Sequence, residues 1–342
     1  MTHRERMRAC LSGAPTDRVP VALWRHFPVD DQSPETLVAA TLHWQRVYDF
    51  DFVKVTPASS FCLKDWGVGD VWEGHTEGTR RYTKRVITRP EDWARLPELD
   101  PTSEHLAAQL ECLRLVRAGL DAETPFIQTV FSPLAQAKNL AGNDTLLAHI
   151  RLYPDAVMQG LETIARSTRR FVEAALETGI DGIFYAIQHA QAGLLSAEEY
   201  KTFGLPLDQQ VIEPAKSSWL NVLHLHGHDI HPSLFSILCS LFPIVNWHDR
   251  ETAPSLAEAL ETQTSEVSET SEVLRAVCGG LRQDTLALGN PAQVREEAED
   301  AIQQTRGRKF ILSTGCVVPV IAPHGNLQAV AQIGNLRYKE ER

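Results

Sequence analysis

Short apolar runs rich in Val, Ile and Phe alternate along the chain with longer amphipathic stretches. Each run is nearly continuous in its apolar character, with no regular polar alternation. Strands that are apolar on both faces are typical of a parallel sheet covered by helices. We therefore expect eight parallel strands, at residues 20–24, 50–56, 125–131, 182–188, 219–227, 243–249, 276–281 and 309–315.

The segments between these runs have the periodicity and the end signals of amphipathic helices. Residues 33–49 begin with Ser33, a favourable N-cap, and with Pro34 in the first turn. Residues 153–179 end on a glycine, and residues 290–307 begin on an asparagine and end on a glycine. These are the usual start and stop signals of helices.

The order of the elements predicts the fold. A strand followed by a helix, repeated eight times, is the pattern of a (β/α)8 TIM barrel, and we expect residues 1–342 to form one such domain. A doubly wound open sheet is the rival, but it usually has fewer strands in this length. The chain also has neither a GxGxxG nor a GxxxxGK[ST] motif.

Two stretches fit the repeat less well. Residues 59–97 are rich in Trp, Gly and charge, and we expect an insertion or lid there, with a β-hairpin around residues 77–86. Residues 261–273 are polar and low in complexity, which indicates a solvated loop or a frayed helix.

Composition and charge limit the classes of function. The chain is 43% hydrophobic and 23% charged, with a formal net charge of -11, which disfavours nucleic acid and anionic membranes as partners. Its six cysteines are scattered and form no CxxC pair. No apolar run reaches the ~18 residues of a membrane span, and the first residues lack the apolar core of a signal peptide. We therefore expect a cytoplasmic protein with reduced thiols.

Polar residues gather where the predicted strands end, which is where TIM barrels place their active sites. Arg25 follows the first run, and Tyr185 and His189 lie at the end of the fourth. We expect these three to line the pocket as catalytic residues. The alternatives are a salt-bridged surface arginine for Arg25 and simple barrel packing for Tyr185 and His189.

His224 and His226 stand two apart at the end of the fifth run, so they face the same side of that strand. A spacing of about 7 Å along a strand allows two imidazoles to converge on one ion. Cys316 follows the eighth run, and imidazole and thiolate are ligands that zinc prefers. One interpretation is a zinc site of His224, His226 and Cys316 with an open fourth position. The other is that all three are ordinary buried residues.

Longer motifs carry a family resemblance. The opening RERMRACLSGAPTDRVPV, the central GIDGIFYAIQHAQAGLLSAEEYKTF and the late FILSTGCVVPVIAPHGNLQAV follow the layout of the uroporphyrinogen decarboxylase superfamily. The chain resembles this superfamily across nearly its whole length. The resemblance implies a TIM barrel, in agreement with the count of strands.

The decarboxylase branch of that superfamily acts without a metal and has two arginines after strand one and an Asp in a Phe-Ser-Asp triplet after strand two. Arg25 falls on the first arginine, but Val29 falls on the second, and residues 56–58 read Thr-Pro-Ala. A His-Gly pair near the last strand is also replaced. Porphyrinogen decarboxylation is therefore the alternative function rather than the leading one.

The other branch resembles the zinc-dependent methylcobamide:coenzyme M methyltransferases, which have His-x-Cys-Gly on strand five and Gly-Cys on strand eight. This chain has His224, His226 and a glycine in the first motif, and Cys316 after a glycine in the second. The resemblance implies zinc, with His226 in place of a cysteine. Exchanging a thiolate for an imidazole raises the charge of such a site from near zero to about +1 and makes the metal a stronger Lewis acid.

The leading hypothesis is a zinc-dependent methyltransferase that activates a thiol for methyl transfer from a corrinoid. The second alternative to it, after the decarboxylase, is a non-catalytic corrinoid- or tetrapyrrole-binding module. The partners we expect are a small-molecule substrate, a corrinoid protein and a second copy of the chain in a homodimer, with no nucleic acid and no membrane.

Overall fold

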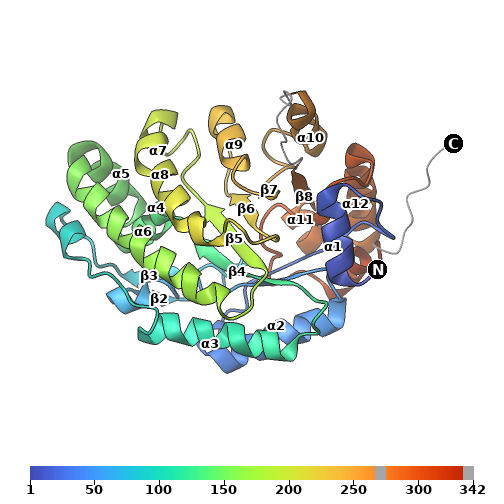
Figure 1. The fold of residues 1–342 in the computed structure, drawn as a ribbon, viewed down its shortest axis with the longest axis horizontal. Helices are drawn as coiled ribbons and strands as arrows, with labels where there is room; N and C mark the ends of the chain where they lie inside the picture. The colour runs from blue at the N-terminus through green and yellow to red at the C-terminus, as the bar shows by residue number, and fades with distance from the viewer. Residues whose placement is uncertain (266–274, 334–342) are drawn as a thin grey trace.

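A computed structural model describes residues 1–265 and 275–333. Its main sheet has seven parallel strands that curl around an axis, with helices on the outside (Figure 1). Strands that follow one another in this sheet are neighbours in space, which is the order of a singly wound barrel and not of a doubly wound sheet. In order, the strands are β1 (Val53–Val55), β4 (Phe126–Phe131), β5 (Gly182–Ile187), β6 (Val222–Leu225), β7 (Ile244–Trp247), β8 (Ala276–Leu281) and β9 (Phe310–Thr314).

The first predicted strand is much shorter than expected, but it occupies the eighth position of the barrel. Val21 forms an isolated parallel bridge with Leu312 of β9. On the other side, the backbone N–H of Asp51, which lies just before β1, donates to the carbonyl of Val21 at 2.8 Å. Pro20 has no N–H to extend the ladder. The single-domain barrel that the sequence predicts is thus confirmed. The short run at residues 20–24 closes the barrel between β9 and β1, and it is called the closing stave below.

The helices cover the outer face of the sheet, and their ends follow the sequence signals only in part. Ser33 accepts a hydrogen bond from the backbone N–H of Thr36, and Asn290 caps the helix that follows it, as predicted. The helices are α1 (His3–Ser12), α2 (Pro34–Tyr48), α3 (Glu104–Gly119), α4 (Pro133–Ala141), α5 (Asn143–Leu152), α6 (Pro154–Leu176), α7 (Ala197–Phe203), α8 (Leu205–Ile212), α9 (Pro232–Cys239), α10 (Leu256–Ser265), α11 (Gln283–Leu288), α12 (Pro291–Thr305) and α13 (His324–Ile333).

The core has two parts, as expected for a barrel whose strand residues alternate between inside and outside. Inside the barrel, Trp24, Phe52, Phe184 and their neighbours form one buried cluster. Met7 and Cys10 of α1 belong to the same cluster, so this helix covers one end of the barrel. The larger cluster lies between the sheet and the helices.

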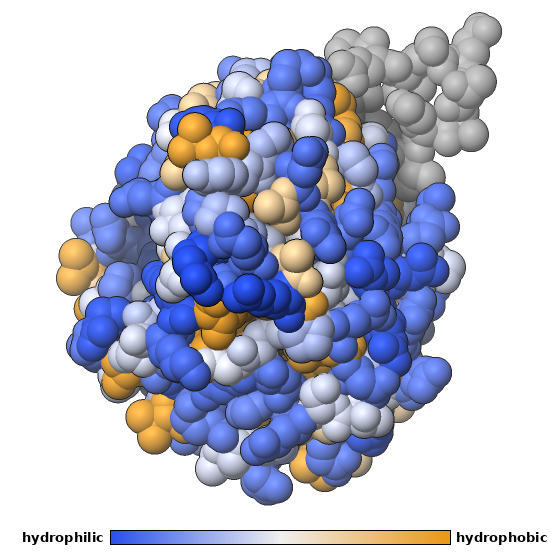
Figure 2. Space-filling model, turned by 90° about the vertical axis from the view of Figure 1, so that its left-hand side faces the viewer, coloured by the Kyte–Doolittle hydropathy of each residue, from blue (hydrophilic) through white to orange (hydrophobic). Residues whose placement is uncertain are grey.

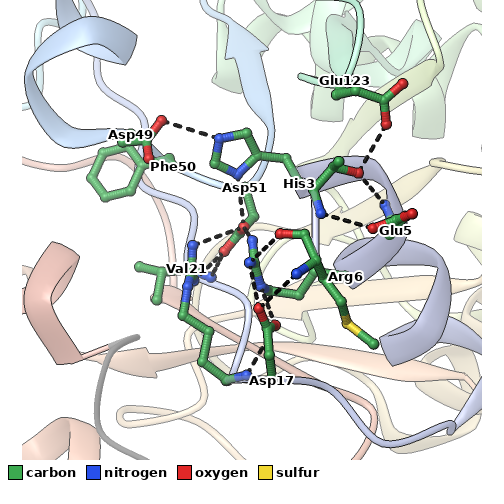
Figure 3. A network of polar contacts seen from close by, with 12 residues as sticks. His3, Glu5, Arg6, Asp17, Val21, Asp49, Phe50, Asp51 and Glu123 are labelled. Carbon is green, nitrogen blue, oxygen red and sulfur yellow. Dashed lines mark hydrogen bonds and ion pairs between the residues drawn. The ribbon is translucent and has the colours of Figure 1, made fainter.

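A buried ion-pair network holds α1 against the closing stave (Figure 3). The carboxylate of Asp51 has no exposed surface and accepts hydrogen bonds from Arg6 at 2.6 Å and Arg18 at 2.7 Å. It also accepts from the backbone N–H of Val21 at 2.7 Å. Asp17 in turn binds Arg6. The Asp-Arg-x-Pro-Val motif at the start of the chain therefore has a structural role at the seam of the barrel.

The segment at residues 59–97 contains the predicted hairpin, in which β2 (Gly69–Val71) pairs antiparallel with β3 (Arg81–Lys84). The turn of this hairpin reaches the loop after β9, because the carbonyl of Thr76 accepts from the backbone N–H of Val320 at 2.6 Å. Gly78 packs so closely on His26 that an added Cβ would lie 2.4 Å from the histidine Cβ. The hairpin turn thus lies at the C-terminal mouth of the barrel, and its action as a lid stays a prediction.

Residues 261–265 of the predicted polar loop form the last part of α10, and the remainder of that loop lies outside the described residues. No helix in the described ranges is both long and apolar enough to cross a membrane. The face shown in Figure 2 is mainly hydrophilic, with hydrophobic residues scattered over it.

Candidate metal centre

Three histidines and one cysteine meet at the mouth of the barrel. The residues are His224 on β6, His226 just after it, His248 after β7 and Cys316 after β9. One ligand atom from each side chain lies within 4.8 Å of those of the others. The structure therefore brings together the three predicted ligands and adds His248, which the sequence interpretation did not include.

The parallel register and one glycine explain why these residues converge. His224 is paired with Asn246 across β6 and β7, so the residues two positions later, His226 and His248, continue on neighbouring strand ends. Before Cys316, the loop after β9 runs against β7, and a Cβ at Gly315 would lie only 2.8 Å from the carbonyl oxygen of Trp247. Only glycine allows this approach.

Asn246 fixes the proton of His224. The amide nitrogen of Asn246 donates to the carbonyls of Cys278 at 2.8 Å and Thr314 at 3.0 Å, so its oxygen must face His224. That oxygen lies 2.7 Å from Nδ1 of His224 and accepts a hydrogen bond from it. Nε2 of His224 therefore keeps its lone pair, and it lies 3.4 Å from Nδ1 of His226. Orientation of a ligand by a second group in this way is typical of metal-binding histidines.

His248 is arranged in the same manner by a carboxylate. Its Nδ1 lies 3.5 Å from a carboxylate oxygen of Glu251. Its Nε2 is buried and has no hydrogen-bond partner within the described parts of the chain. A buried ring nitrogen without a partner is costly unless something binds it. This nitrogen is therefore a suitable donor for an ion.

The cluster holds neutral groups in the absence of an ion. Burial lowers the pKa of His226 to about 3. Burial also places the pKa of His224 well below its ordinary value. Burial raises the pKa of the Cys316 thiol to about 12. Its sulfur lies 3.6 Å from Nδ1 of His226.

Three imidazoles and one thiol form a donor set that fits zinc, which prefers nitrogen and sulfur ligands in a tetrahedron. A divalent cation would favour the thiolate of Cys316, because it supplies the positive charge that the buried site lacks. The sequence contained the signal for the fourth residue. In the run Ile244–Trp247, Asn246 faces inward, so alternation places His248 on the same side.

Arg25 lies at the mouth but outside the cluster. Its guanidinium stands 4.9 Å from the ring centroid of Trp44 and 5.1 Å from that of Phe27. One nitrogen donates to the carbonyl of Val320 at 3.3 Å, and Nε is buried without a partner in the described residues. Burial lowers the pKa of Arg25 from its ordinary value. A role in holding an anionic group stays a prediction.

Tyr185 is not brought to the cluster. It lies on β5 in the core between the sheet and the helices, and its hydroxyl donates to Asp208 of α8 at 2.6 Å. Its neighbour Phe184 faces the inside of the barrel instead. Because alternation sends adjacent residues to opposite faces, the position of Tyr185 gives no support to a place in the pocket.

His189 lies just after β5, and it is fully buried with neither ring nitrogen hydrogen-bonded to any described residue. Burial lowers its pKa to about 3, with a further contribution from the charge of Lys138. The side chain is neutral and lacks partners, which suits contact with a ligand. Its catalytic role stays a prediction.

The turn after the cluster leads into α9, whose N-cap residue is His231, without a side-chain capping bond. Pro232 occupies the first turn of this helix and needs no N–H partner there.

Comparison with known proteins identifies the family to which the barrel belongs. The profile of the family described as uroporphyrinogen decarboxylase (URO-D) matches residues 2–335. The chain belongs to this family. The matched region thus contains the whole URO-D barrel described above, from α1 to α13.

Relatives of this URO-D chain include methyltransferases of similar length. It is 22% identical to methylcobamide:CoM methyltransferase MtbA of Methanosarcina acetivorans, over 98% of the chain and 99% of that protein. It is 23% identical to methylcobamide:CoM methyltransferase MtaA of Methanosarcina barkeri, over 96% of each. The solved structure of a methyltransferase from Methanosarcina mazei has a TM-score of 0.82 at 18% identity, covering 97% of this chain and 98% of that one, which shows a shared fold.

Proposed function

We propose that this URO-D family member is a zinc-dependent methyltransferase that transfers a methyl group from a corrinoid to a thiol. The observation that carries the proposal is the cluster of His224, His226, His248 and Cys316 at the barrel mouth. The printed activity of the relatives MtbA and MtaA supports it, because both are methylcobamide:CoM methyltransferases. We further propose that the methyl donor is presented by a corrinoid protein at this mouth.

The residues of the chain would act by holding the cation and the thiol. His224 offers Nε2 because Asn246 holds its Nδ1 proton, and His248 offers Nε2 while Glu251 faces its other nitrogen. Bound zinc would lower the pKa of an acceptor thiol toward neutral pH. A site with one thiolate keeps a net positive charge, which favours binding of the thiol as its anion.

The chemical step is a displacement at the methyl carbon. The sulfur of the acceptor forms a bond to the methyl carbon as the cobalt–carbon bond breaks, and the electron pair of that bond stays on cobalt. The proton of the thiol leaves to solvent or to a base at the mouth. Glu251, with a carboxylate oxygen 3.5 Å from Nδ1 of His248, is a carboxylate at the mouth that could take this proton.

The test is a methyl-transfer assay with free methylcobalamin as donor and 2-mercaptoethanesulfonate as acceptor. Demethylation of the corrinoid is followed by its visible absorption, and the methylated thiol by mass spectrometry. We expect turnover with zinc-loaded protein and at least a 100-fold loss in Cys316→Ala. Conversion of uroporphyrinogen to coproporphyrinogen that persists after chelation, without methyl transfer, would contradict the proposal and favour the decarboxylase alternative.

A further inference from the structure

The hairpin turn between β2 and β3 places an acidic side chain beside the loop that carries Cys316. Oε1 of Glu77 accepts a hydrogen bond from Nε2 of Gln283, the first residue of α11, at 3.0 Å. The same Nε2 donates to the carbonyl of Val317 at 2.7 Å. Val317 directly follows Cys316 in the chain. One amide nitrogen therefore joins the carboxylate of the hairpin to the cysteine loop of the metal centre.

Further contacts hold the turn on both sides of Glu77. Before it, the carbonyl of Thr76 accepts a hydrogen bond from the backbone N–H of Val320 at 2.6 Å. After it, Gly78 packs on His26, where an added Cβ would lie 2.4 Å from the histidine Cβ. In this docked position, the turn fixes the carboxylate at the barrel mouth.

The charge of Glu77 acts on two residues of the cluster. Burial is the main cause of the raised pKa of the Cys316 thiol, and the carboxylate of Glu77 adds to that effect. Burial lowers the pKa of His248, and the carboxylates of Glu251 and Glu77 oppose that change. A single carboxylate on the hairpin thus lies within electrostatic range of ligands that follow two different strands.

The attraction between Glu77 and the cluster depends on a bound ion. Without an ion, the buried imidazoles and the thiol are neutral, so a nearby carboxylate gains little from them. A divalent cation held by three imidazoles and one thiolate would give the site a net charge of about +1. The carboxylate repels the thiolate, but the doubly charged ion attracts it more strongly, and the net effect on ion binding is favourable.

We propose that Glu77 couples the binding of a divalent cation at the cluster to the docking of the hairpin turn over the barrel mouth. The carboxylate stabilises the bound cation, and the cation in turn holds the turn in its docked position, because coupling between two equilibria is reciprocal. Glu77 is a positioning residue outside the ligand set, and Gln283 orients it. The inference rests on the metal-binding part of the proposed function and is independent of methyl transfer.

Glu77→Gln tests the charge without removing the contact. The glutamine oxygen can still accept from Gln283, so the hydrogen bond is retained and only the negative charge is lost. Competition with a chromophoric chelator should show a zinc affinity reduced by about 10-fold, the lower end of the range for groups that act on a metal from outside its ligands.

Glu73→Gln is the matched control. Glu73 belongs to the same hairpin and pairs with Arg81 at 2.6 Å, in a contact that is exposed on both sides. The substitution removes an equal charge from the same segment and should leave the zinc affinity at the wild-type value. The melting temperatures of the three metal-free proteins should agree. A loss of affinity as large as that of Glu77→Gln would assign the effect to overall charge and overturn the proposal.

Hydrogen exchange tests the coupling in the reverse direction. The amide proton of Val320 is the probe, because the docked turn binds it through the carbonyl of Thr76. Zinc should slow its exchange in the wild type by about the factor that Glu77 adds to zinc affinity, roughly 10-fold. In Glu77→Gln, zinc should slow this exchange far less.

The outcomes separate this inference from the proposed function. An effect of Glu77→Gln on zinc affinity and on Val320 exchange would support the inference even if methyl transfer from methylcobalamin is absent. Equal zinc affinities of the wild type and Glu77→Gln, with equal slowing of Val320 exchange, would overturn it and leave the proposed function standing. Wild-type protein that binds no zinc would overturn both.

Discussion

The positions of protons on single residues decide whether the cluster is suited to a cation. Asn246 holds the Nδ1 proton of His224 because its own amide nitrogen is committed to two backbone carbonyls. Glu251 faces Nδ1 of His248 and leaves the buried Nε2 without a partner. The burial that keeps these imidazoles neutral also keeps their lone pairs available.

Replacing Asn246 by alanine should weaken zinc binding without removing a ligand. His224 would lose the acceptor that fixes its tautomer, and changes of this kind usually cost about 10- to 100-fold in metal affinity. Competition with a chromophoric chelator measures the affinity. The matched control is His228→Ala, an exposed histidine beside His248 that is outside the cluster and should retain wild-type affinity. Equal affinities in all three proteins would contradict this assignment.

His248 should be a ligand, which cobalt substitution tests directly. The Co²⁺-loaded wild type should show the intense visible bands of a tetrahedral site and a sulfur-to-metal charge-transfer band. His248→Ala should alter the visible bands and retain the charge-transfer band, whereas Cys316→Ala should lose it. An unchanged visible spectrum in His248→Ala would show that the ion is held by the other three residues alone.

Among the elements, the closing stave depends most on contacts distant in sequence. It has one bridge to β9 and one hydrogen bond from Asp51, and the buried carboxylate of Asp51 ties it to α1 (Figure 3). His3 of α1 also contacts Asp51, with Nδ1 3.0 Å from a carboxylate oxygen. The hydrogen bond to Asp51 raises the pKa of His3, against the opposing effect of burial.

This contact predicts a pH dependence of stability. Because the pKa of His3 is raised above 6.5 by folding, its contribution is complete below that pH and is lost as pH rises through the raised value. The melting temperature of the wild type should therefore fall over that interval. His3→Gln should remove this part of the slope. A wild-type slope identical to that of His3→Gln in thermal scans would contradict the role of the ion pair.

Across the whole molecule, the parallel order of the strands gathers the chemistry at one end. The ligands lie on β6 or just after β6, β7 and β9, and the hairpin turn of β2 and β3 lies over the same mouth. The URO-D barrel thus presents its candidate metal centre where neighbouring strands end.

Much of this arrangement was predictable from local patterns. Apolar runs gave the strands of the barrel, and Ser33 and Asn290 marked helix starts, because these signals depend on neighbouring residues. The spacing of His224 and His226 placed both on one strand face. The shortness of the first strand was not predictable, since it depends on pairing with β9, almost 300 residues away.

The remaining differences between expectation and structure concern which face of a strand a residue occupies. Tyr185 was expected in the pocket because it stands near the end of its strand, yet the inward residue is its neighbour Phe184. A shift of one residue reverses the face of every side chain in a strand. For the run that ends at Trp247, the same alternation would have identified His248, which follows inward Asn246 by two residues.

The metal content of the purified protein tests the central claim most directly. Elemental analysis is performed on the wild type and on Cys316→Ala and His226→Ala, each after zinc loading and removal of free metal. The account predicts about one tightly held zinc per wild-type chain, a clear loss in both variants, and apo-protein that regains thiol binding when zinc is added. Wild-type protein that retains no zinc, and whose melting temperature and thiol binding are the same with and without the metal, would contradict it.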